Sequence, residues 1–120
     1  GLQAFAQAWP TTALDARFAL REERRRVSIT AQLTTRLASS TEASVRRAAV
    51  LAMSALGSEG FHALLLPSLR DPSPEVRIAV IQALAAVDDP ALRPQLAETL
   101  SDPDGSVREV ARRSIMRTVG

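Results

Sequence analysis

The sequence predicts an all-α fold, an α-solenoid of about three and a half to four antiparallel helix pairs. Three observations lead to this prediction. A segment recurs at an interval of 31 residues, its apolar residues follow the spacing of a helix, and no stretch alternates long enough to form a strand. Since one helix pair cannot bury its own apolar face, successive pairs must stack.

The recurring segment predicts the longer helix of each pair. Residues 71–80 read DPSPEVRIAV, residues 102–111 read DPDGSVREVA, and a fainter copy, STEASVRRAA, occupies residues 40–49. In this register, apolar or small residues recur at offsets of 0, 3, 4, 7 and 8 from a shared valine, which marks one face of an α-helix. These faces predict long helices near residues 43–56, 74–87 and 104–118.

A second apolar register precedes each long helix and predicts its shorter partner. Phe61, Leu65 and Leu69, for example, recur with a spacing of four. The short turns between the helices imply that neighbouring helices are antiparallel. The helices expected from this register and from the chain before it lie near residues 13–26, 27–38, 59–69 and 90–100.

Capping signals agree with these boundaries. The sequence predicts Ser73 as an N-cap with Pro74 at the first helical position, and Asp104 takes the same place in the last unit. Gly57 follows a predicted helix as a stop signal.

The whole chain, residues 1–120, is expected to form one repeat domain. Its apolar start, GLQAFAQAW, has no polar cap, so we expect the chain to be a fragment of a longer protein. The expected units are a divergent N-terminal unit at 1–26 and repeats at 27–57, 58–88 and 89–120.

Composition and charge exclude several classes of site. The 120 residues include no Cys, Tyr or Lys and a single His, which leaves few groups for metal binding or proton transfer. The pI of 10.9 accompanies a net charge of only +2, because all the basic residues are Arg. With neither a long apolar run nor a signal-peptide pattern, a cytoplasmic location is expected.

The second unit contains the motif L-x-D-P-x-x-x-V-R-x-x-A-x-x-A-L, with one Ala shifted by a position, in Leu69, Asp71, Pro72, Val76, Arg77, Ala79, Ala83 and Leu84. This motif resembles the HEAT repeat, in the short class found in bacterial proteins and bilin lyase-type chains. The resemblance covers roughly residues 27–118. It implies a right-handed superhelix whose long helices line the concave side.

The resemblance also implies a structural role for the recurring charges. In HEAT-like repeats the turn aspartate and the helix arginine link stacked turns in a ladder. The first unit has Ser40 where the aspartate should stand, so Arg46 is left to pair with Asp71 or to face solvent. The ladder pairs that the resemblance implies are Asp71–Arg77 and Asp102–Arg108.

The first functional hypothesis is a non-enzymatic scaffold. Its concave helix face would bind a partner protein or a neighbouring domain of the same chain. The residues expected on that face are of mixed chemistry, which suits protein recognition better than phosphate. They are Arg47, Ile78, Gln82, Glu109 and Arg113.

The second hypothesis is a nucleic-acid-binding module. The run REERRR at residues 21–26 is the densest charge cluster and could bind phosphate, or could be a solvated face with internal ion pairs. The last helix has a second cluster, which is either a polar terminal cap or a basic strip. The two sets are Arg17, Arg21, Arg24 and Arg25, and then Arg108, Arg112, Arg113 and Arg117.

A third hypothesis is an accessory, non-catalytic domain of a larger enzyme. No phosphate-binding glycine loop or nucleophile motif occurs, and His62 lacks partners at metal-ligand spacing. No catalytic residue, metal or cofactor is therefore expected.

Overall fold

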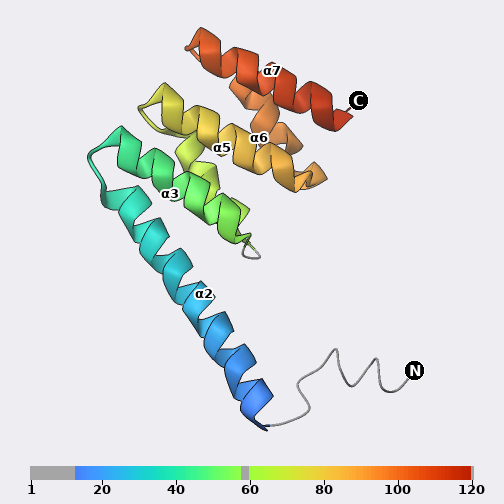
Figure 1. The fold of residues 1–120 in the computed structure, drawn as a ribbon. Coiled ribbons are helices and arrows are strands. Elements are labelled where there is room, and N and C mark those ends of the chain that lie inside the picture. Colours follow the sequence, from blue (N-terminus) through green and yellow to red (C-terminus); the bar gives the residue numbers. More distant parts are fainter. Residues whose placement is uncertain (1–12, 58–59, 120) are drawn as a thin grey trace.

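The computed structural model describes residues 13–57 and 60–119, and every regular element in that part of the chain is a helix. It confirms the predicted all-α solenoid. The long helices α3 (Ala43–Leu56), α5 (Pro74–Val87) and α7 (Gly105–Val119) lie side by side in one layer (Figure 1). The Cα atoms span 55 × 37 × 17 Å, and the thin dimension fits two layers of helices.

The second layer contains the shorter helices, which combine α-helical and 3₁₀ segments. The first is α4 (Phe61–Leu65), which continues as η1 (Leu66–Arg70). Pro67 lies at the start of η1, where its missing N–H cannot support an α-helical bond. The next short helix comprises η2 (Pro90–Leu92), α6 (Arg93–Glu98) and η3 (Thr99–Ser101).

The first helix of the described chain, α2 (Ala13–Ser39), is one continuous element of 27 residues. The predicted division into helices at 13–26 and 27–38 is wrong. The physical reason is that this stretch contains neither Gly nor Pro and is rich in strong helix formers, so nothing ends the helix. Only its C-terminal half packs on α3, while its N-terminal half extends away from the solenoid (Figure 1).

Helix α5 lies at the centre of the core, since it packs on α3 at one side and on α7 at the other. This position explains why its apolar residues occupy nearly the whole circumference rather than one stripe. Ile81 and Leu84 are both fully buried. The other buried residues of α5 are Val76, Ala79, Val80 and Ala83.

The helix ends follow the capping signals in part. Asp104 Oδ1 accepts hydrogen bonds from the backbone N–H groups of Ser106 and Val107, so it caps α7 as predicted. Gly57 has φ +60°, which ends α3 in the left-handed conformation that glycine tolerates best. Ser73 occupies the N-cap position of α5 but donates its hydroxyl to Glu75 instead.

Candidate interaction surfaces

Two ion pairs between successive repeats hold the edge of the solenoid where the long helices begin. Arg46 Nε and Nη2 donate to the two carboxylate oxygens of Asp71, at 2.8 and 2.9 Å. Arg77 binds Asp102 in the same way, at 2.9 and 3.0 Å. None of the four side chains is more than 13% exposed, so loss of one partner would leave a charge poorly hydrated.

Each arginine of these pairs also binds the turn of its own repeat. Arg77 Nη1 donates to the backbone carbonyl of Asp71 at 2.7 Å, and Arg46 Nη1 donates to that of Ser40 at 3.1 Å. Asp71 in turn accepts a bond from the backbone N–H of Ser73 at 2.9 Å. One guanidinium therefore ties together two turns, such as those of Ser40 and Asp71, that are adjacent in space and 31 residues apart in sequence.

The carboxylate pairing differs from the one that the resemblance implied, and of the two alternatives left open for Arg46 the structure shows the pair with Asp71. Asp71 binds Arg46 rather than Arg77, and Asp102 binds Arg77 rather than Arg108. The reason is geometric. Each aspartate carboxylate accepts a hydrogen bond from the backbone N–H two residues later, and this bond holds it facing the preceding repeat. The arginine in the first helical turn of that preceding repeat is therefore the one within reach. The arginine six residues later reaches only the backbone carbonyl.

The pairs also shift the ionisation of their carboxylates. Burial alone would raise the pKa of Asp71, but the hydrogen bonds from Arg46 and Ser73 outweigh it and hold the pKa below its ordinary value. The pKa of Asp102 is lowered in the same way, against burial, by Arg77 and the N–H of Asp104. Each of these two carboxylates accepts three hydrogen bonds within the protein, which is typical of a structural role.

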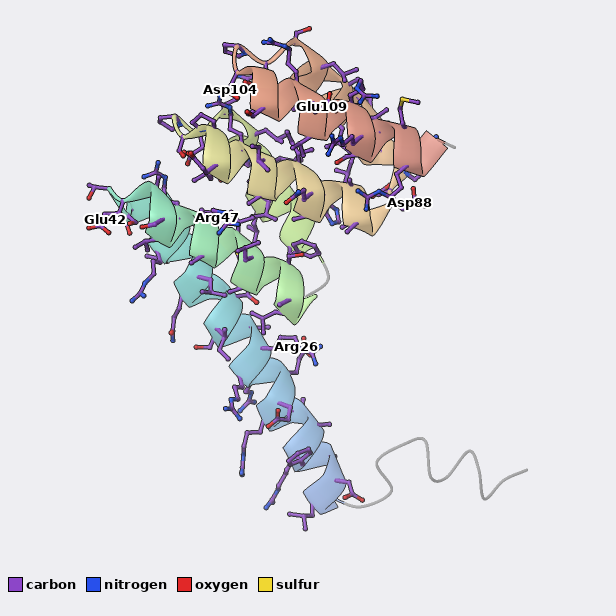
Figure 2. All side chains as sticks on the ribbon, turned by 45° about the horizontal axis from the view of Figure 1, so that its top comes forward. Arg26, Glu42, Arg47, Asp88, Asp104 and Glu109 are labelled. Atoms are coloured by element: carbon purple, nitrogen blue, oxygen red, sulfur yellow. The ribbon has the colours of Figure 1, made fainter. Side chains whose placement is uncertain are left out.

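The residues predicted to bind a partner lie on the long helices but differ in exposure. Arg47 on α3, Gln82 on α5 and Arg113 on α7 are exposed. Ile78 is partly buried and packs against the core. Glu109 is also partly covered, and it lies against Arg113, whose Nε donates to its carboxylate at 2.9 Å. Figure 2 shows Arg47 and Glu109 on their separate helices of this layer.

A hollow of about 440 Å³ opens between the C-terminal halves of α5 and α7. Gln82 contributes to it, and so does Arg117, which the sequence predicted only as part of a polar cap or basic strip, whereas its other residues were not predicted as binding residues. Leu51 on α3 was also missed, although its side chain is 44% exposed. Its place in the same register position as Gln82 and Arg113 is the sequence signal that could have identified it. The residues that line the hollow are Gln82, Ala85, Ala86, Asp88, Ser114 and Arg117.

The predicted basic patch lies on the projecting half of α2. All four of its residues are exposed, and their spacing places them on one broad side of the helix. Part of the local charge is neutralised by i,i+3 pairs, Arg25 with Glu22 at 3.9 Å and Arg26 with Glu23 at 3.8 Å. The patch residues are Arg17, Arg21, Arg24 and Arg25.

The basic cluster on α7 is less positive than its sequence suggests. Glu109 accepts bonds from both Arg112, at 2.7 Å, and Arg113, at 2.9 Å. Hydrogen bonds from these two arginines lower the pKa of Glu109, Arg112 contributing most, so the carboxylate stays charged at neutral pH. A single acid thus offsets part of the charge on this face.

The part of the chain that the structure describes contains no group of His, Asp and Glu side chains that could hold a metal ion. His62 is partly buried and packs edge-on against Phe61. Among the helices of residues 13–57 and 60–119, none has both the length and the apolar character that a membrane crossing needs.

Comparison with known proteins gives one match. A model of the HEAT repeats matches residues 30–116, which is more than half of the chain and includes residues of all three helix pairs. No curated protein and no solved structure matches this sequence. HEAT repeats generally mediate interactions between proteins. The family match and the stacked helix pairs together show that this chain belongs to the HEAT-repeat family.

Proposed function

We propose that the chain is a non-enzymatic scaffold that binds a partner protein, or a neighbouring domain, on the face formed by α3, α5 and α7. The observation that carries this proposal is the hollow between α5 and α7, which places Gln82 beside small apolar side chains and the charged Asp88 and Arg117. Such a mixture of apolar, amide and charged groups is typical of protein interfaces.

The edge of the solenoid where the turns lie offers a partner few free polar groups. Its four ion-paired residues are nearly buried and already bonded to one another and to backbone groups. On the long-helix face, by contrast, Leu51 and Arg47 are exposed on α3, and Gln82 is exposed on α5. An exposed leucine next to polar groups can be buried by a partner at little desolvation cost.

Site-specific photo-crosslinking tests this face. A photoreactive residue is introduced at Gln82, and at Arg93 on the opposite layer as a control, because both positions are exposed. The purified chains are incubated with native cell extract and irradiated. We expect a defined protein adduct from position 82 and none from position 93.

Charge variants then establish specificity. Leu51→Glu combined with Arg113→Asp should abolish the adduct without changing the melting temperature, since both side chains are exposed. Arg93→Asp, which makes on the other layer the same charge change as Arg113→Asp alone, should leave the adduct intact. An adduct that survives the first pair of changes would show that the partner binds elsewhere.

A second candidate function, binding to nucleic acid, is favoured by one observation on α2. Arg17, Arg21 and Arg24 have no carboxylate within 4 Å among the described residues, so their charges are available for phosphate. Binding through these groups should weaken steeply between about 50 and 200 mM salt. Failure of duplex DNA and of single-stranded DNA and RNA to bind at about 50 mM salt would eliminate this function.

A further inference from the structure

The last arginine of the register, Arg108, has the same local setting as Arg46 and Arg77 but lacks their partner. Each of the three lies in the first turn of a long helix and donates from Nη1 to the backbone carbonyl six residues earlier. For Arg108 this acceptor is Asp102, at 2.7 Å, and Nη1 also reaches the carbonyl of Pro103 at 3.1 Å. The guanidinium is therefore anchored to its own turn.

The other edge of this guanidinium is free of carboxylates within the described chain. In Arg46 and Arg77, Nε and Nη2 bind the two oxygens of an aspartate that lies 25 residues later. No ion pair of Arg108 occurs among residues 13–57 and 60–119, and the residue is exposed. An arginine that is held in place through Nη1 and whose Nε and Nη2 have no carboxylate partner is suited to bind a carboxylate through two parallel hydrogen bonds.

We propose that the outer face of α7 is a docking surface for a further helical repeat whose opening turn contains an aspartate. That aspartate would bind Arg108 as Asp71 binds Arg46 and as Asp102 binds Arg77. The inference goes beyond the proposed function, because it concerns the end of the solenoid rather than the face of its long helices.

A second copy of this chain does not supply the required group. Stacked head to tail, it would present the turn before α3, where the register position of the aspartate is Ser40. A serine hydroxyl has no charge and one oxygen, so it cannot accept parallel hydrogen bonds from both Nε and Nη2 of Arg108. The occupant is instead a repeat that begins like residues 71–72 or 102–103, with Asp-Pro.

The rest of the outer face is compatible with stacking. Arg112 occupies the register position of Ile81, which is fully buried on α5, the helix that packs on both α3 and α7. Its charge already has a counter-ion, because Nε and Nη2 of Arg112 both donate to Glu109. Met116, one turn later, is 62% exposed and offers apolar surface to the incoming repeat.

An extended chain tests the docking surface. A copy of residues 89–119 is joined directly after Val119, which places the copied aspartate 25 residues after Arg108, as in the two existing pairs. Arg108→Gln and replacement of the copied aspartate by asparagine form a double-mutant cycle. We expect a coupling of roughly tenfold in the unfolding equilibrium constant. The Arg108 Nε–H should also exchange more slowly with water than in the 120-residue chain.

Two comparisons make the result decisive. The existing pair gives the reference, because Arg77→Gln and Asp102→Asn should show coupling of similar size in the same chain. A second extension, with a copy of residues 58–88, also places an aspartate at the required position. If neither extension couples to Arg108, or if the added repeat contributes no helical signal, the proposal is overturned and α7 is a terminal cap.

Discussion

At the scale of single residues, the stacking of repeats depends on a few side chains that each serve two turns. Asp71 receives two bonds from Arg46 and one from the backbone of Ser73. The recurrence of Asp and Arg in the sequence predicted that these residues are structural. It did not reveal the pairing, because a 31-residue register places an arginine both six residues after each aspartate and 25 residues before it.

The first prediction concerns the loss of one such carboxylate. Asp71→Ala should lower the free energy of unfolding by about 3 kcal/mol, because it leaves the nearly buried Arg46 without its counter-ion. Asp89→Ala is the matched control, since Asp89 accepts a single bond, from the N–H of Ala91, and should cost about 1 kcal/mol. Urea unfolding measures both, and equal losses would contradict the dual role of Asp71.

The second prediction is a dependence of stability on pH. Because the folded chain lowers the pKa of Asp71 and Asp102, their contribution is complete above the unfolded pKa of about 4 and is lost as pH falls through the lower folded value. We expect the free energy of unfolding to be nearly level from pH 7 to about 5 and to fall below about pH 4.

Urea unfolding at a series of pH values measures this dependence. The double variant Asp71→Asn, Asp102→Asn should lose part of the slope, whereas the remaining slope belongs to other carboxylates such as Glu75 and Glu109, whose pKa values are also lowered. An unchanged slope in the double variant would show that neither aspartate contributes to the acid dependence.

At the scale of elements, the long helices were predictable and the short ones only in part. Apolar stripes and caps located α3, α5 and α7 to within a residue or so. The stripes could not show that the short helices tighten into 3₁₀ turns at Leu66 and Thr99, because the same residues face the core in either form.

The boundary predicted within α2 failed for a different reason. It was inferred from the register of the later units, in which each short helix begins after a turn. Only local signals can end a helix, and the sequence around residue 26 contains none. The hydroxyls of Thr30, Thr34 and Thr35 instead donate to carbonyls four residues earlier, so these polar side chains are accommodated within the helix.

The third prediction tests the two halves of α2. Phe18 is 63% exposed on the projecting half, whereas Leu37 is 5% exposed against the core. Phe18→Ala should therefore change the free energy of unfolding by less than about 0.5 kcal/mol. Leu37→Ala should lower it by about 2–5 kcal/mol, because it removes buried contacts and leaves a cavity. A large loss for Phe18→Ala would mean that the projecting half is packed in solution.

At the scale of the whole molecule, the sequence predicted the layer of long helices better than the exposure and pairing of the residues on it. The register showed that Gln82 and Arg113 point away from the core. It did not show that Ile78 would be partly covered or that Glu109 would be occupied by two arginines, since both depend on neighbouring side chains. The exposure of a side chain and its ion pairs depend on how the helices pack together and not on the sequence of one helix.

The last prediction concerns how stability is distributed along the solenoid. Each repeat contacts only its neighbours, so the central helix, which is flanked on both sides, should open least often. In native-state hydrogen exchange, the amides of Val80, Ile81 and Leu84 in α5 should exchange slowest. Residues 13–28 of α2 should exchange fastest, because an unsupported helix of that length is only marginally stable.

Uniform slow exchange along all of α2 would contradict this distribution. It would require something to cover Leu14, Phe18, Leu20 and Val27, all of which are more than half exposed in the monomer. Repeating the hydrogen-exchange measurement at a tenfold lower protein concentration identifies what packs on these residues. Protection that falls on dilution would show that two projecting helices pair, because association depends on concentration. Protection that persists would show that a segment of the same chain packs on the projecting half of α2.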